Sequence, residues 1–267
     1  MGGPLSRRTD TMASTFERIK NLLRARRAGH QPTTDAGGPV LAAHPAAAID
    51  IRPVETQMEA DEVWALLSEQ IEHGWDDCLP QPLAHDDDAF RPTLIGAWGQ
   101  DGLIAGAFVM PDEQTADTFM ANGVQHAAQM TLRAVAVTQG IAVAPEHRRE
   151  GVGLKIKRFC DAWAAQHHAC LMLSVITAHE ALGPDQKTGH HILPTDVVPV
   201  IQIHDDATGT GCLIDLGPRG QTAGHSQWSI GVIGQTHGLT IHLGQYGATE
   251  DPPRGPDDIT WIAHIGT

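Results

Sequence analysis

The sequence predicts a mixed α/β fold in which a central sheet is flanked by helices and followed by a C-terminal extension that is mostly β. Two observations lead to this prediction. Over residues 49–176, apolar runs typical of strands alternate with segments whose apolar residues recur at helical spacing. Beyond Leu193, the pattern changes to short apolar runs separated by glycine-rich turns.

The N-terminal segment, residues 1–48, is expected to be a short basic helix followed by a flexible linker. Ser14 and Glu17 have the spacing of a helix capping box, and residues 28–48 are rich in Ala, Gly, Pro and Thr. The helix could bind a partner, an anionic surface or the acidic remainder of the chain, and it could equally be a frayed tail. Its apolar residues recur at helical spacing: Phe16, Ile19, Leu22 and Leu23.

The first part of the core, from residue 49, is predicted to be a strand, a helix and a β-hairpin. Thr56 and Glu59 form a second capping-box signature, and Gly74 stands where a helix C-cap would be. Asp101-Gly102 is a hairpin signal. Residues 75–91 read as an acidic loop, and residues 111–130 as a polar, partly helical insertion. The expected strands are Ile49–Val54, Thr93–Trp98 and Leu103–Met110.

A long strand, Leu132–Val143, comes next, and Gln139-Gly140 inside it suggests a β-bulge. A helix over Val152–Gln166 and a strand over Cys170–Ile176 follow it. The core is therefore expected to span residues 49–195. Residues 196–267 are expected to complete the sheet with two strands and to add an extra β module. The strands expected there are Val197–Ile203, Gly211–Leu216, Trp228–Ile233, Leu239–Leu243 and Ile259–Ile265.

The net charge of −14 is unevenly distributed along the 267 residues. Residues 1–30 carry seven Lys/Arg against two Asp/Glu, a charge of +5, which leaves −19 for the remainder. Such a remainder disfavours nucleic acid and favours a cationic small molecule or a basic peptide, although solubility alone explains it equally well. No apolar run is long enough for a membrane span or a signal peptide, and no C-x-x-C pair occurs. We therefore expect a cytoplasmic protein.

The stretch Val143–Gly153 is the main functional signal. An apolar strand passes Pro145 and enters a helix through Arg-x-x-Gly-x-Gly. Helix N-termini offer free N–H groups, and glycines let a backbone approach a ligand closely, so the loop suits a phosphate or pyrophosphate. The spacing matches neither a P-loop nor a Rossmann fingerprint. Positive charge is expected from Arg148, Arg149, Lys155, Lys157 and Arg158.

The pattern V-x-P-x-x-R-x-x-G-x-G between a strand and a helix resembles motif A of the GCN5-related N-acetyltransferases, the GNAT superfamily. The resemblance covers residues 49–177. It implies a GNAT-type fold, acetyl-CoA or another acyl-CoA as co-substrate, and acyl transfer to a primary amine by direct attack. It also implies that Ile141, Ala142 and Val143 line the pantetheine arm, with the Val143 N–H polarising the thioester carbonyl. The implied pyrophosphate cradle is Arg148, Arg149, Glu150, Gly151, Val152, Gly153 and Leu154.

The catalytic groups cannot be carried over from the family, because the usual Tyr is missing after the strand that ends near residue 176. The sole tyrosine is Tyr246. It is our candidate acid, and His179 and Glu180 are candidate bases by position, as is the pair His190-His191. Each of them could instead be an ordinary surface or core residue.

Two function classes remain open at this stage: an N-acetyltransferase, and a catalytically inactive acyl-CoA-binding regulator. The acidic clusters at residues 85–88 and 204–206 have no zinc-like spacing, so no metal is expected. The acidic loop lies where the family shapes its acceptor site, which suits a cationic amine. A homodimer is possible.

Overall fold

The computed structural model of the protein describes residues 48–71, 90–176, 182–195, 198–215, 227–246 and 259–262. The predicted basic helix, Gly74 and nearly all of the acidic loop lie outside these ranges. Within them, no helix is long and apolar enough to cross a membrane.

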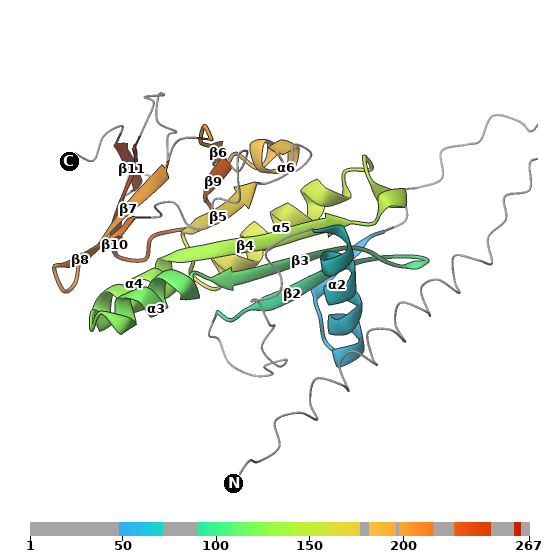
Figure 1. Ribbon diagram of the computed structural model, residues 1–267, viewed down its shortest axis with the longest axis horizontal. Coiled ribbons are helices and arrows are strands. Elements are labelled where there is room, and N and C mark those ends of the chain that lie inside the picture. The colour runs from blue at the N-terminus through green and yellow to red at the C-terminus, as the bar shows by residue number, and fades with distance from the viewer. Residues whose placement is uncertain are drawn as a thin grey trace, which may run out of the picture. The chain divides into compact units, whose positions relative to one another are not determined.

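A seven-stranded sheet forms the centre of the described chain, in the order β1-β2-β3-β4-β5-β9-β6. Neighbouring strands are antiparallel except β4 and β5, which are parallel. With helices on its faces, this sheet confirms the predicted mixed α/β class (Figure 1). The strands are β1 Asp50–Pro53, β2 Thr93–Gly99, β3 Gly102–Pro111, β4 Val135–Val143, β5 Leu171–Ile176, β6 His191–Ile192 and β9 Gln227–Val232.

Helices α2 (Gln57–Gln70) and α5 (Val152–Gln166) cover opposite faces of this sheet. The predicted capping box starts α2, because Thr56 accepts from the Glu59 N–H while Glu59 accepts from the Thr56 N–H. Buried apolar residues of α2 pack with Ala142 of β4, whereas those of α5 pack on the face to which Ile141 and Val143 contribute. Alternate residues of β4 therefore face different helices.

The insertion after β3 is a helical hairpin, α3 (Glu113–Ala121) and α4 (Gln125–Ala134). The expected strand start at Leu132 is wrong, because helix α4 continues to Ala134 and β4 begins at Val135. The reason is packing: α4 buries residues at helical spacing, namely Ala127, Ala128, Met130, Thr131 and Ala134.

The predicted bulge is present in β4. Phe108 of β3 pairs with Gly140, and the next residue, Val109, pairs with Thr138, so Gln139 has no partner across the β3–β4 ladder. On its other side, β4 pairs with β5 only over Val135–Thr138. The strands therefore part at the bulge, and the second half of β4 presents an edge that β5 does not pair.

The C-terminal strands divide differently from the prediction. Of the five expected there, only β9 joins the main sheet, and the other added strand is the two-residue β6. The remaining four form a second sheet in the order β11-β10-β7-β8. Its buried residues share one apolar cluster with α4, β5 and β9. Its strands are β7 Val198–Asp205, β8 Thr210–Asp215, β10 Leu239–Tyr246 and β11 Ile259–Ile262.

Candidate functional site

The edge of β4 that β5 does not pair presents backbone hydrogen-bonding groups, of which the Val143 carbonyl accepts from Arg148 Nε. Ala142 pairs with Gly106, and the Ala144 N–H donates to the Ile104 carbonyl at 2.9 Å, so these residues are bonded to β3. Hydrogen-bonding direction alternates along a strand, so the N–H and C=O groups of Ile141 and Val143 point to the side of β5. Because β5 has already parted from β4 there, an extended ligand could pair with these two residues as an added strand.

The loop that follows β4 has a backbone shaped for anion binding. After a short 3-10 helix, Pro145–His147, two residues take left-handed conformations: Arg149 at φ 67° and Gly151 at φ 79°. A positive φ is uncommon for a non-glycine residue, and it turns successive N–H groups toward a common point. At the other end of β4, α4 runs into the strand, so the loop and the α3–α4 hairpin lie at opposite ends of β4 (Figure 1).

Among the described residues, no side chain caps the start of helix α5. Its N-cap residue is Gly151, and no acidic residue lies in the first turn. The first N–H groups of a helix have no partner within the helix, and the helix dipole adds positive potential there. The start of α5 is therefore suited to hold a phosphate between Gly151 and Leu154.

Gly153 keeps space open at this helix start. A Cβ added at Gly153 would lie 3.6 Å from Val143 Cγ2 and 3.8 Å from Pro184 Cγ, which are ordinary contact distances. The fold alone therefore does not require glycine here. A ligand phosphate that approaches the backbone closely would require it.

The basic residues of the motif are used in different ways. Arg148 donates from Nε to the Val143 carbonyl at 3.2 Å and from Nη2 to Gln70 Oε1 at 2.7 Å, so it ties the loop to the ends of β4 and α2. Arg149 and Lys155 are exposed. The expectation that Lys157 adds charge at the loop is wrong, because its side chain is 0% exposed and paired with Asp161.

Lys157 belongs to a buried group of polar side chains that the sequence analysis did not find as a group. Lys157 and Asp161 of α5 meet Asp185 of α6 (Leu182–Lys187), His190 before β6 and Ser229 of β9. Of these five residues, only His190 was predicted to be a catalytic candidate, and that prediction rested on its position in the sequence. The i,i+4 spacing of Lys157 and Asp161 signalled an ion pair, but nothing local signalled its burial.

The catalytic candidates are not brought together by the described residues. His179 and Glu180 lie in residues 177–181, outside the described ranges. Tyr246 is the last residue of β10, where it pairs with Val198 in the second sheet, and its side chain is also outside the description. The roles of these three residues stay predictions.

The acidic cluster at residues 204–206 has a structural role where it is described. Asp205 Oδ1 accepts from the N–H groups of Ala207 and Thr208 at 2.9 and 3.1 Å, and Asp206 accepts from the Thr240 hydroxyl at 2.9 Å. These carboxylates therefore stabilise the β7–β8 turn and its contact with β10.

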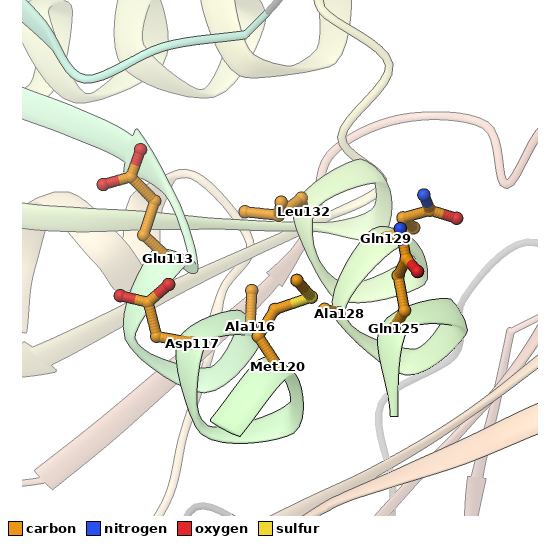
Figure 2. Close-up of a pocket in the computed structure, with 8 residues that line it drawn as sticks. All are labelled: Glu113, Ala116, Asp117, Met120, Gln125, Ala128, Gln129 and Leu132. Carbon is orange, nitrogen blue, oxygen red and sulfur yellow. The ribbon is translucent and has the colours of Figure 1, made fainter. Parts of the chain in front are cut away.

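A groove lies between α3 and α4, with a volume of about 370 Å³. Figure 2 shows Glu113 and Asp117 side by side on α3, across from Gln125 and Gln129 of α4, with Met120 and Leu132 between them. Burial, and then the neighbouring Asp117, raise the pKa of Glu113 above its usual value. None of the residues predicted for the site lines this groove.

The bulged β4, which parts from β5 and leads through a glycine loop into α5, is the arrangement that the sequence resemblance to the GNAT superfamily implies. No protein-family model matches the chain, and no curated protein matches it. Solved structures that resemble it include the ribosomal-protein-S18-alanine N-acetyltransferase of Escherichia coli (11% identity, TM-score 0.41, covering 68% of this chain and 91% of that one). A GNAT family acetyltransferase from Elizabethkingia anophelis with acetyl-CoA bound is similar at 15% identity (TM-score 0.39, 68% and 96% covered). A putative phosphinothricin N-acetyltransferase is similar at 13% identity (TM-score 0.43, 68% and 96% covered).

Proposed function

We propose that the protein is an acyl-CoA-dependent N-acyltransferase of the GNAT type. The observation that carries this proposal is a combination of two features at one end of β4. One is the strand edge that β5 does not pair, and the other is the start of α5, where Gly151 is the N-cap and no side chain caps the helix. An acyl-CoA has the two matching parts, an extended amide-bearing pantetheine arm and a pyrophosphate. The proposal rests on this chain's own geometry.

The loop Arg148–Leu154 would bind the pyrophosphate through its backbone N–H groups, with Arg149 and Lys155 supplying charge. Ile141 and Val143 would pair with the pantetheine amides along the open edge of β4. The last of these groups, the Val143 N–H, would then lie near the thioester and donate to its carbonyl oxygen. As negative charge develops on that oxygen during attack, this hydrogen bond would strengthen and lower the barrier.

In the proposed reaction the acceptor amine attacks the thioester carbonyl carbon directly. A C–N bond forms, the C–S bond breaks, the nitrogen loses a proton and the departing thiolate gains one. We keep His179 and Glu180 as proposed bases and Tyr246 as the proposed acid, on their sequence positions. Holding both substrates in one complex would supply much of the rate.

The proposed acceptor is a cationic amine, since the chain beyond residue 30 carries a net charge of −19. A charged nucleic acid is disfavoured for the same reason. We also propose a reducing, cytoplasmic location, which agrees with the free thiols of Cys160, Cys170 and Cys212.

Calorimetric titration of acetyl-CoA into wild type and Gly151→Glu tests the proposal. A carboxylate at Gly151 would repel the pyrophosphate, so we expect binding to wild type and none to the variant. Gly209→Glu is the matched control, because Gly209 also has a positive φ, 67°, and a Cβ added there would also have nothing within 4 Å. It should bind acetyl-CoA like wild type. A folded wild type that does not bind acetyl-CoA would overturn the proposal.

A turnover assay then separates the enzyme from the alternative, an inactive acyl-CoA-binding regulator. Release of free CoA thiol, measured across a panel of amines that includes polyamines and amino acids, is expected for an enzyme. Binding that Gly151→Glu abolishes, with no thiol release from any amine, would support the regulator instead.

A further inference from the structure

The buried polar group next to the proposed acyl-CoA loop joins three elements of the fold. The side chains of Lys157 and His190 are 0% and 1% exposed, and those of Asp185 and Asp161 are 8% and 14% exposed. Ser229 is fully buried. Burying so many ionisable groups is costly unless they are paired. We call these five residues the α5–α6 cluster.

The ion pairs within the α5–α6 cluster bridge α5 to α6. Lys157 Nζ lies 2.5 Å from Asp161 Oδ1 and 3.6 Å from Asp185 Oδ1. His190 places Nδ1 3.2 Å from Asp185 Oδ1 and Nε2 3.2 Å from Asp161 Oδ2. Ser229 donates to Asp185 Oδ1 at 3.1 Å, which attaches the cluster to β9. The imidazole is thus held between carboxylates from two different helices.

Two protonation states of His190 fit this geometry with different hydrogen bonds. When the imidazole is neutral with its proton on Nδ1, Nε2 can accept from Lys157 Nζ, which lies 3.1 Å away. When the imidazole is protonated, Nε2–H donates to Asp161 instead. With Lys157 charged and both aspartates ionised, the cluster has no net charge in the protonated state and one negative charge in the neutral state.

The surroundings favour the protonated state. Burial lowers the pKa of His190, but the hydrogen bonds to Asp161 and Asp185 outweigh it and, despite the charge of Lys157, leave the pKa raised. The charged groups that face the ring are Lys157 and Asp161 from α5 and Asp185 from α6. From β9 the described neighbours are uncharged: Ser229, and Gly231, where an added Cβ would lie 2.2 Å from the ring.

The cluster lies beside the proposed phosphate loop. Lys157 follows Gly153 by four residues, so the two share one face of α5. On α6, Pro184 lies opposite Gly153, and its neighbour Asp185 lies opposite Lys157. With six residues, α6 is too short to be stable alone. Tertiary contacts, among them those of this cluster, therefore fix its position against α5.

We propose that Lys157, Asp161, Asp185 and His190 are positioning residues that hold α6 at the distance from α5 that acyl-CoA binding requires, and that this hold depends on the proton of His190. The inference rests on the proposed function for its acyl-CoA part. The sign follows from a histidine whose pKa is raised in the fold: the contribution of its proton to holding α6 is fully present below the unfolded pKa and is lost as the pH rises through the folded pKa, while the Lys157–Asp185 ion pair remains. The negative charge that then remains also opposes the pyrophosphate.

The experiment measures three quantities from pH 5.5 to 8.5 in wild type and His190→Gln. They are the imidazole titration of His190 by NMR, the hydrogen exchange of α6 amides without ligand, and the Kd of acetyl-CoA. In wild type we expect α6 protection to fall and the Kd to rise with the titration, by up to about tenfold for each pKa unit by which binding stabilises the proton. In His190→Gln neither quantity should follow that midpoint. The CoA phosphates titrate with both proteins, so the difference between wild type and His190→Gln isolates the contribution of His190.

Asp161→Asn keeps the proposal testable if His190→Gln does not fold. Losing that carboxylate should move the His190 midpoint, and the α6 exchange midpoint with it, to lower pH, which a merely structural role would not do. If His190 titrates while α6 exchange stays unchanged, the proposal is overturned. If acetyl-CoA does not bind at any pH, the proposed function fails, and the α6 exchange alone then decides whether the cluster holds α6.

Discussion

At the scale of single residues, a substitution at Gly153 is expected to weaken ligand binding without lowering the stability of the fold. Its added Cβ would meet Val143 and Pro184 at ordinary contact distances, and it has no positive φ. Gly153→Ala should therefore fold, with an unfolding free energy equal to or up to about 1 kcal/mol above wild type, since alanine restricts the unfolded chain. The same methyl group would occupy the cradle, so the acetyl-CoA Kd should rise at least tenfold.

Urea unfolding and calorimetry check the Gly153→Ala prediction together. Gly183→Ala is a useful control, because nothing lies within 4 Å of a Cβ added there. It should leave acetyl-CoA binding unchanged. Unchanged binding by a well-folded Gly153→Ala would mean that no ligand approaches this part of the helix backbone.

Glu59 is a second residue that yields a prediction, which concerns the pH dependence of the stability of the fold. Arg52, whose Nη2 donates to Glu59 Oε1 at 2.6 Å, and then the Glu55 N–H lower the pKa of Glu59 to about 2. A lowered carboxyl pKa stabilises the fold above the unfolded pKa, and that stability is lost as the pH falls toward 2. Glu59→Gln should thus be destabilised by about 1 kcal/mol at pH 7 and should equal wild type near pH 2.

Denaturant unfolding at pH 7, 4 and 2 measures the difference between Glu59→Gln and wild type. Glu55→Gln is the matched control, since the Glu55 side chain is 71% exposed and its Oε1 lies 3.9 Å from Arg52 Nη1. It should differ little from wild type at any pH. A Glu59→Gln difference that persists at pH 2 would rule out the ion pair as its source.

At the scale of elements, the features that depend on residues close together in the sequence were predictable. The features that depend on packing against distant residues were not. The capping box of α2 and the bulge in β4 depend on residues no more than three positions apart, and both were predicted. The boundary between α4 and β4 was misplaced, because Leu132-Arg-Ala-Val carries no glycine, proline or cap to mark it. Only the packing of the buried face of α4 sets that boundary.

The groove of the α3–α4 hairpin yields a prediction for Glu113. Burial and the charge of Asp117 both raise the pKa of Glu113. Asp117→Asn should therefore lower this pKa toward the usual value, as measured by NMR of the carboxyl carbon. A carboxyl whose pKa is raised in the fold weakens stability at pH above that pKa, so the variant should gain stability at pH 7 and none at pH 3.

Glu62→Gln removes the same charge from an exposed position of α2 and serves as the control. It should leave the Glu113 titration where it is in wild type. If Asp117→Asn also leaves it unchanged, burial alone accounts for the raised pKa, and the two carboxylates do not interact across the groove.

At the scale of the whole molecule, the proposed phosphate loop was predictable from one stretch of sequence, whereas the α5–α6 cluster was not. The loop residues follow one another along the chain. Lys157 and His190 are 33 residues apart, and only the tertiary fold brings them together. An extra β module in the C-terminal part was predicted, but which of the strands join the main sheet was not, for the same reason. An apolar run predicts a strand and leaves its partner undetermined.

The two sheets share a core, and this predicts how the described fold unfolds. Ile241 of β10 is fully buried in a cluster that also contains Leu171 and Leu173 of β5 and Met130 of α4. Ile241→Ala should therefore cost about 2–5 kcal/mol and shift one cooperative transition. Amides of β5 should lose as much hydrogen-exchange protection as those of β10. Leu213→Ala on β8, 47% exposed, should stay within about 0.5 kcal/mol of wild type. Loss of protection confined to the second sheet would instead show that it unfolds separately, and the C-terminal strands would then be an appended module.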